Sequence, residues 1–180
     1  LDQRGIEYNL AYVGYAIGHE LSHCLDNTGS KYDEIGNLKE WWSKEDKAKY
    51  QKKIDDVIKQ YEEAAKKDGI DFDASIGTGE NLADISGLSL AEEYLFYFQL
   101  LNDDIAPIKN KSLESFYIYS AQTWRQKIFD KALPAQLKQN PHPLDKFRCN
   151  CPLSRLPLFR EIYKVKEGDG MWWHNTDTIW

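Results

Sequence analysis

The sequence has few cysteines, no block of basic residues and no long apolar run. Its three cysteines among 180 residues form an odd, sparse set, unlike a disulfide framework. A net charge of −6, without any run of five basic residues, gives no support to nucleic-acid binding. The longest apolar run, Tyr94 to Leu101, is far shorter than the roughly 20 residues that a membrane span needs. We expect neither a nucleic-acid partner nor a membrane segment in this chain.

The amino terminus also lacks two common features. It has no initiator Met, and it has no charged-then-apolar segment of the kind that forms a signal peptide. We therefore expect a fragment or mature piece of a longer protein. The sparse cysteines favour an intracellular location, and a secreted or membrane-anchored extracellular protein stays open as the alternative.

The chain does contain enough apolar material for one domain, residues 1–180, with a buried core. Hydrophobic residues make up 42% of the sequence and aromatic residues 13%, which excludes a disordered polar tail. Four segments carry apolar side chains at helical spacing: Ile6–Leu25, Lys44–Lys67, Glu80–Leu101 and Leu113–Phe129.

Capping and breaking residues mark where these helices begin and end. Ser43, with Asp46 three residues on, predicts the start of the second helix, and Gly69 follows its end. Pro134 and the segment Asn140–Pro143 predict loops. No segment alternates regularly between polar and apolar residues, so we predict a mostly α domain.

The strongest local signal is a His-Glu-x-x-His motif that runs from His19 to His23. Residues four apart on a helix lie on the same face, one turn above the other. Two imidazoles at this spacing can converge on one zinc ion at about 2.0–2.1 Å. Glu20 can then reach the metal-bound water as a general base. The motif predicts one zinc per chain; the alternative is a solvated helix face with two histidines and an acid.

A catalytic zinc takes three protein ligands and keeps one open position, and Glu80 is the candidate third ligand. It stands at the start of the third predicted helix, after Gly77-Thr78-Gly79, where small residues let the backbone approach closely. Asp84 shares its face, and Asp26 shares the face of the two histidines. Ligand histidines usually donate their second ring nitrogen to a carboxylate. Both aspartates are candidates for this role, with a lysine salt bridge (Asp84) and a helix end (Asp26) as alternatives.

A longer set of motifs, in a fixed order, covers most of the chain from Tyr12 to Trp180. These motifs are Ile17–Asp26, Gly36–Leu38 with Trp41 and Trp42, Gly79–Gly87, Asn140–His142, Phe147 and Arg148, Asn150 with Pro152 and Leu153, and Ile179–Trp180. In these residues the chain resembles the catalytic carboxy-terminal region of the neprilysin-like zinc endopeptidases, which include bacterial oligopeptidases. The ordered set is far more specific than the His-Glu-x-x-His motif alone.

The resemblance implies a thermolysin-like zincin domain, the carboxy-terminal part of a larger two-lobed peptidase, that hydrolyses internal peptide bonds of oligopeptides. It assigns His142 to stabilising the transition state and Arg148 to binding a substrate carbonyl. It also implies a pocket for the residue after the scissile bond, lined by Tyr15, Ala16, Thr123 and Trp124. Taken without the resemblance, His142 is a turn residue between prolines, Arg148 an exposed charge and Trp124 a core residue of its helix.

The chain departs from the family in two places. Family members carry an upstream, largely helical lobe and an Asn-Ala segment that docks the substrate, and neither is among these residues. The tail lacks the cysteine that mammalian members use in a disulfide, so it is closer to the bacterial branch, although an arginine usual near the end is missing too. The first alternative function is therefore a catalytically impaired or inactive relative that acts as a peptide-binding or structural domain. A structural zinc domain is the second.

The remaining conspicuous residues receive no chemical role. Cys149 and Cys151 lack the partners that a metal site needs. Cys24, next to a histidine, is expected to be a buried thiol rather than a ligand. His174 is expected to be exposed. Trp41 and Trp42 are expected to be structural rather than catalytic.

Overall fold

The computed structural model describes residues 2–102 and 110–180. In chain order the helices are α1 (Ile6–Asn9), the π-helical turn η1 (Leu10–Gly14), α2 (Tyr15–Ser22), the 3-10 turns η2 (His23–Leu25) and η3 (Gly29–Lys31), α3 (Lys44–Lys67), α4 (Thr78–Leu101), α5 (Asn110–Thr123), α6 (Leu133–Gln139), α7 (Asp145–Arg155) and α8 (Pro157–Tyr163). Within the described ranges, strand pairing is limited to one isolated bridge between Tyr32 and Leu38. The mostly α prediction is confirmed.

The first three predicted helices are present close to their predicted bounds. The predicted segment Ile6–Leu25 is continuous from α1 to η2, although its winding changes three times along the way, from α to π, back to α and then to 3-10. Helix α3 has the predicted ends, and the Ser43 hydroxyl accepts from the backbone N–H of Asp46 at 3.0 Å, as an N-cap should. Helix α4 begins two residues before the predicted start at Glu80.

Two of the predictions for the second half of the chain are wrong. Helix α5 ends at Thr123 instead of Phe129. The residues after it offer no buried face, since Phe129 is 80% exposed, and the Trp124 ring turns to pack against Tyr15. Pro134 was expected in a loop, but it lies in the first turn of α6, where its missing N–H costs no helical hydrogen bond.

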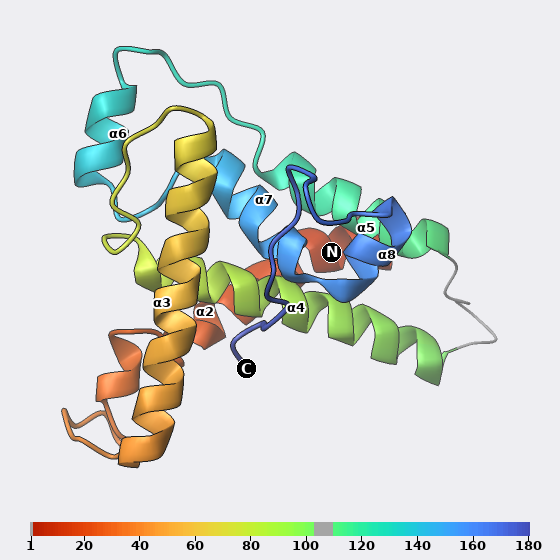
Figure 1. Ribbon diagram of the computed structural model, residues 1–180. Coiled ribbons are helices and arrows are strands. Elements are labelled where there is room, and N and C mark those ends of the chain that lie inside the picture. Colours follow the sequence, from red (N-terminus) through yellow and green to blue (C-terminus); the bar gives the residue numbers. More distant parts are fainter. Residues whose placement is uncertain (1, 103–109) are drawn as a thin grey trace.

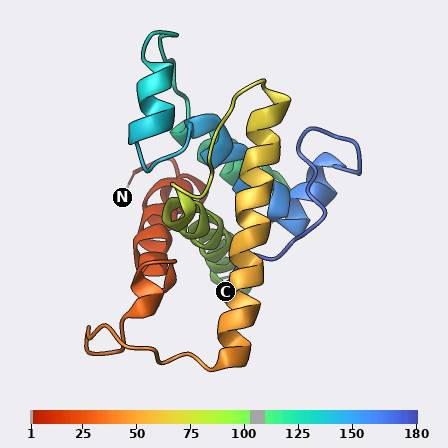
Figure 2. The ribbon, with the colours of Figure 1, turned by 60° about the vertical axis from the view of Figure 1, so that its left-hand side comes forward.

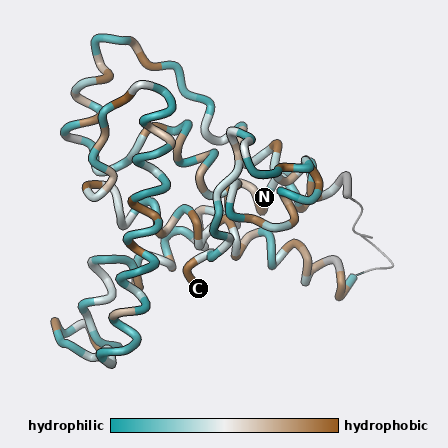
Figure 3. Tube along the Cα trace, viewed as in Figure 1, coloured by the Kyte–Doolittle hydropathy of each residue, from teal (hydrophilic) through white to brown (hydrophobic). Residues whose placement is uncertain are grey.

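Helix α4 is the central element of the molecule (Figure 1) and passes beside both hydrophobic clusters. One cluster lies among α1, η1, α4, α5, α7 and α8 and includes Leu88, Leu95 and Phe116. The other lies among α3, the first part of α4, α7 and the carboxy-terminal tail, and includes Tyr61, Leu82 and Phe147. Figure 2 shows α3 and α2 on opposite sides of α4. Figure 3 shows that α3 is largely hydrophilic, whereas α4 carries a larger share of hydrophobic residues.

Two glycines let α2 and α4 cross in direct backbone contact. A Cβ atom at Gly18 would lie 3.1 Å from the Cα of Gly87, and a Cβ at Gly87 would lie 2.6 Å from the backbone nitrogen of His19. The distance at Gly87 is too short for any side chain, so only glycine fits there, and a side chain at Gly18 would fit only if the backbone of α4 moved aside by a few tenths of an ångström. The crossing brings His19 of α2 beside the first two turns of α4, where Glu80 and Asp84 lie.

A buried carboxyl group on α4 makes the stability of the fold depend on pH. Glu92 is 8% exposed and accepts a hydrogen bond from the Tyr117 hydroxyl on α5. Burial raises the pKa of Glu92 from 4.5 to about 6, although the hydrogen bond from Tyr117 opposes the change. A carboxyl whose folded-state pKa is raised contributes stability that is fully present below pH 4.5 and is lost as the pH rises through about 6.

Replacing Glu92 by Gln should therefore stabilise the protein above pH 6 and have little effect at pH 4. The amide keeps an acceptor for Tyr117 without a buried charge, and the rise of the Glu92 pKa from 4.5 to about 6 corresponds to a free energy of about 2 kcal/mol. Urea unfolding at pH 4 and pH 8 measures the difference, with the exposed neighbour Glu93→Gln as the matched control. An equal stability of Glu92→Gln and wild type at pH 8 would show that the ionised carboxylate carries no penalty.

Other expectations concern exposure and membrane insertion. Cys24 is exposed, so the expectation of a buried thiol is wrong there, whereas Cys151 is buried and Cys149 lies between the two. His174 is exposed, as expected, and its Nε2 lies 3.1 Å from a carboxylate oxygen of Asp56. None of the helices in the described residues has the length and apolar character to cross a membrane.

Candidate metal centre

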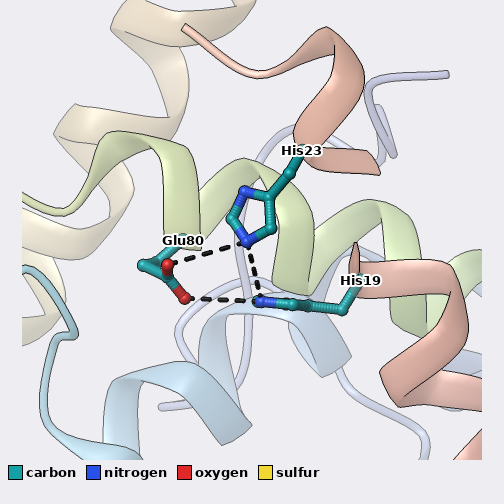
Figure 4. A group of neighbouring side chains, drawn as sticks. All are labelled: His19, His23 and Glu80. Carbon is teal, nitrogen blue, oxygen red and sulfur yellow. Dashed lines mark hydrogen bonds and ion pairs between the residues drawn. The ribbon is translucent and has the colours of Figure 1, made fainter. Parts of the chain in front are cut away.

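Three side chains from α2, η2 and α4 converge on one point (Figure 4). The Nε2 atoms of His19 and His23 lie 3.1 Å apart. The Glu80 carboxylate lies 3.4 Å from Nε2 of His19 and 3.6 Å from Nε2 of His23. Two ligand atoms at about 2.05 Å from a tetrahedral zinc are about 3.3 Å apart. These separations, in which Glu80 turns Oε2 to His19 and Oε1 to His23, are close to this value, so the donor set fits a zinc ion.

A carboxylate lies against the other ring nitrogen of each histidine. Asp26 Oδ2 lies 2.8 Å from Nδ1 of His23, while Oδ1 of the same carboxylate accepts from the backbone N–H groups of Thr28 and Gly29. Asp26 thus both faces the ligand His23 and closes the turn after the helix, so the two roles expected for it are compatible. Asp84 Oδ1 lies 2.9 Å from Nδ1 of His19.

The charges of the centre favour a cation at the shared point. In the neutral tautomer whose Nδ1–H faces the carboxylate, each histidine turns the lone pair of Nε2 towards Glu80. Burial alone would lower the pKa of His19, but contacts with Asp84 and Glu80 outweigh it and raise this pKa to about 9. Burial likewise opposes ionisation of Glu80, yet His19, His142 and Arg148 lower its pKa to about 2. Positive charge is favoured at the shared point.

His142 reaches this centre from a loop between α6 and α7. Its Nε2 lies 3.2 Å from Oε2 of Glu80, and its side chain is about half exposed. The Asn140 side-chain oxygen lies 3.0 Å from Nδ1 of His142 and accepts from its backbone N–H at 2.9 Å. The Gln136 amide donates to the His142 carbonyl at 3.3 Å. The imidazole therefore turns Nε2 towards the metal ligands.

Arg148 on α7 is largely buried and forms a bidentate pair with Asp84. Its Nε donates to Oδ2 at 2.7 Å and its Nη2 to Oδ1 at 2.8 Å. Nη2 also lies 3.1 Å from Glu80, and the guanidinium carbon lies 4.5 Å above the Trp124 ring. The alternative of an exposed surface charge is wrong for Arg148. Asp84 does form a salt bridge, but with this arginine rather than with a lysine.

The remaining candidate residues fall into two groups. Tyr15 and Trp124 line a small hollow with Arg148, and the Tyr15 hydroxyl donates to Asp84 at the bottom of the site. The hollow has an open volume of about 10 Å³, room for about one water molecule. Ala16 and Thr123 do not line it. The Glu20 side chain, next to His19, is exposed to solvent.

Comparison with known proteins shows to which family the chain belongs. Residues 3–179 match the model of peptidase family M13. The chain belongs to peptidase family M13. Among curated M13 relatives, the neutral endopeptidase of Lactobacillus helveticus is 32% identical over 179 residues, and an endothelin-converting enzyme homologue of Locusta migratoria is 31% identical over 166. These alignments cover 96% and 91% of this chain, and 25% and 23% of the relatives.

Solved M13 structures share the fold. PepO of Lactobacillus rhamnosis matches 99% of the chain with a TM-score of 0.81 and 28% identity. The zinc metalloprotease Zmp1 of Mycobacterium tuberculosis, in complex with an inhibitor, matches 96% with a TM-score of 0.83 and 30% identity. Each match covers 27% of the solved chain. The M13 chain thus has the zincin-like fold of these peptidases, and it spans about a quarter of the length of the relatives it matches.

Two features of the centre were missed by reasoning from the sequence. Asn140 was seen only as part of a loop and of the Asn140–His142 motif, although its position two residues before His142 is that of a residue whose side chain can close a turn onto the following backbone. Gly18 and Gly87 were seen only as members of motifs. Their role is to permit the helix crossing, which becomes visible once α2 and α4 are placed together.

Proposed function

We propose that this chain is the metal-binding part of a zinc-dependent endopeptidase that hydrolyses internal peptide bonds of oligopeptides. One observation carries the proposal most directly: Nε2 of His19, Nε2 of His23 and the Glu80 carboxylate converge at separations close to those of a tetrahedral zinc site. Each ligand histidine also has a carboxylate at its other nitrogen. Three ligands leave one position open, which favours a catalytic zinc over a structural one. Membership of family M13 supports the same conclusion.

His19, His23 and Glu80 would hold the zinc. When bound, zinc polarises a carbonyl group and acidifies a water molecule. Glu20 follows His19 on α2, and its side chain is exposed to solvent. In the proposed mechanism Glu20 accepts the proton of the water and later delivers it to the amine that leaves.

Two cationic or polar groups would steady the reacting peptide. As an imidazolium, His142 can donate from Nε2 to the oxygen that becomes negative during attack, while Nδ1 donates to the side-chain oxygen of Asn140. Arg148 directs Nε and Nη2 at Asp84 and Glu80. Its Nη1 has no acceptor among the described residues, so Nη1 is the nitrogen we assign to a substrate carbonyl. In this arrangement Asp84 orients both His19 and Arg148.

The proposed substrate pocket lies where Tyr15 and Trp124 meet. Their rings pack edge to face, with centroids 5.8 Å apart, beside the Arg148 guanidinium. A large apolar side chain after the scissile bond would pack favourably against these aromatic rings. The present hollow is too small for such a side chain, so Trp124 would have to move to admit it. Ala16 and Thr123 would border the pocket rather than line it.

The remainder of the M13 protein is the second proposed partner. The relatives are about four times as long as this chain, judged by the 25% of the Lactobacillus helveticus enzyme that is matched. The upstream lobe of the family would cover the site and restrict access to oligopeptides. The activity proposed above is therefore that of the longer protein.

Chelation of the metal tests this function. A quenched oligopeptide should be cleaved at an internal bond, a zinc chelator should abolish cleavage, and one equivalent of added zinc should restore it. The treated protein should keep its helical circular dichroism, because the two hydrophobic clusters are built from apolar side chains and contain none of the three zinc ligands. Cleavage that persists after complete removal of zinc would contradict the proposal. Peptide binding without any cleavage would indicate an inactive relative.

A further inference from the structure

His142 lies on a loop and not on a helix, so some contact must hold this loop in place beside the metal ligands. Its Nε2 nevertheless lies 3.2 Å from Glu80 at the start of α4. Asn140 and Gln136 hold the ring and the carbonyl of His142, but both belong to the same stretch of chain as His142 itself. Neither contact fixes the loop against α4.

The loop is held against α4 at Gly77, directly before the helix begins. A Cβ atom at Gly77 would lie 2.7 Å from the carbonyl oxygen of Pro141, and 3.0 and 3.1 Å from Cγ and Cδ of Pro143. The first of these neighbours is backbone, and the Pro143 ring is buried, so neither can turn aside cheaply. Gly77 has no left-handed φ angle. Glycine is needed here for the close approach alone.

We propose that Gly77 is a positioning residue for His142: its missing side chain seats the Pro141–Pro143 segment on the start of α4 and so sets the distance from His142 to the metal ligands. Gly77 stands three residues before Glu80, and its carbonyl accepts the helical hydrogen bond from Asn81. A shift of the loop away from Gly77 therefore changes the distance between His142 and Glu80 directly. The inference rests on the peptidase function proposed above.

A second glycine, Gly79, makes room for a metal-ligand contact and not for the His142 loop. A Cβ at Gly79 would lie 2.8 Å from Oδ2 of Asp26, the oxygen that faces His23. Gly79 therefore makes room for the carboxylate behind a metal ligand, whereas Gly77 makes room for the His142 loop. A change at Gly77 should disturb transition-state stabilisation while zinc binding is kept.

Gly77→Ala in the whole peptidase tests this inference. The added methyl group should push the loop outward, and a misplacement of about 1 Å can cost about a hundredfold in rate. We expect kcat for a quenched peptide to fall by about this factor, with KM and zinc stoichiometry unchanged. The matched control is Gly170→Ala, which introduces the same methyl group into open space without a left-handed φ.

A readout other than activity follows the same displacement. With cobalt(II) in place of zinc, paramagnetic relaxation of the His142 ring protons reports their distance from the metal. This relaxation should weaken in Gly77→Ala and stay at the wild-type value in Gly170→Ala. Unchanged kcat together with unchanged relaxation would overturn the inference. A wild-type protein that binds metal but cleaves no peptide would instead overturn the proposed function, and the relaxation measurement would still decide the role of Gly77.

A second variant covers the case in which Gly77→Ala fails to fold. Pro143→Ala cannot crowd α4, because it removes the ring that lies against Gly77. Without this contact the loop is less firmly seated, so kcat should fall and the relaxation of the His142 ring should weaken. Wild-type values of both quantities in Pro143→Ala would contradict the seating of His142 through this contact.

Discussion

Glu20→Gln should abolish peptide cleavage while the zinc stays bound. The amide has nearly the same shape as the carboxylate but cannot accept the proton of the attacking water. Loss of general acid–base catalysis typically costs about 10²–10⁴-fold in rate. Because the exposed Glu20 side chain is not among the three converging ligands, the metal content of the variant should equal that of wild type. Single-turnover cleavage of a quenched peptide, with metal analysis of the same sample, measures both.

The control for this variant is Glu62→Gln, the same chemical change at an exposed position on α3. It should cleave at the wild-type rate. If Glu20→Gln cleaves as fast as Glu62→Gln, another group takes the proton and the assignment of Glu20 is wrong. If Glu20→Gln instead loses its zinc, Glu20 has a role in metal binding that the geometry does not indicate.

Glu80→Ala should remove the metal together with the activity. Glu80 is the one carboxylate among the three converging ligand atoms, and it also neutralises part of the charge of His19, His142 and Arg148. Its loss leaves two histidine ligands, too few for a stable zinc site. We expect zinc to be lost on dialysis, and cleavage to fall to the level of the chelated wild-type protein.

Glu93→Ala is the matched control, because Glu93 is an exposed acid on the same helix, about 20 Å along α4 from Glu80. It should keep zinc and activity. Stoichiometric zinc in dialysed Glu80→Ala would remove Glu80 from the ligand set. Thermal unfolding monitored by circular dichroism separates a loss of metal from a loss of the fold.

The local parts of this structure could be predicted from the sequence because short-range rules determine them. Helix α3 has its predicted ends, since Ser43 caps one end and Gly69 follows the other. The spacing of His19 and His23 places both side chains on one face as soon as the segment is helical. By contrast, the end of α5 depends on where burial stops, and periodicity alone extended that helix too far.

The long-range parts required either the resemblance or the coordinates. The approach of Glu80 to the two histidines cannot be predicted from neighbouring residues in the sequence. It results from the crossing of α2 and α4 at Gly18 and Gly87. The approach of His142 depends on contacts between a loop and the distant Gly77. Such contacts depend on how the elements pack in three dimensions. Single glycines permit them, and a single glycine adds nothing to the periodic pattern of apolar residues from which helices are predicted.

The identity of the ligands is tested most directly by a crystal structure of the zinc-loaded protein recorded at the zinc absorption edge. We expect one anomalous peak per chain, within about 2.0–2.2 Å of Nε2 of His19, Nε2 of His23 and the Glu80 carboxylate, with a fourth position taken by solvent. A peak elsewhere, or no peak between these side chains, would contradict the proposed centre. A fourth protein ligand on the metal would make the zinc structural and contradict the catalytic role.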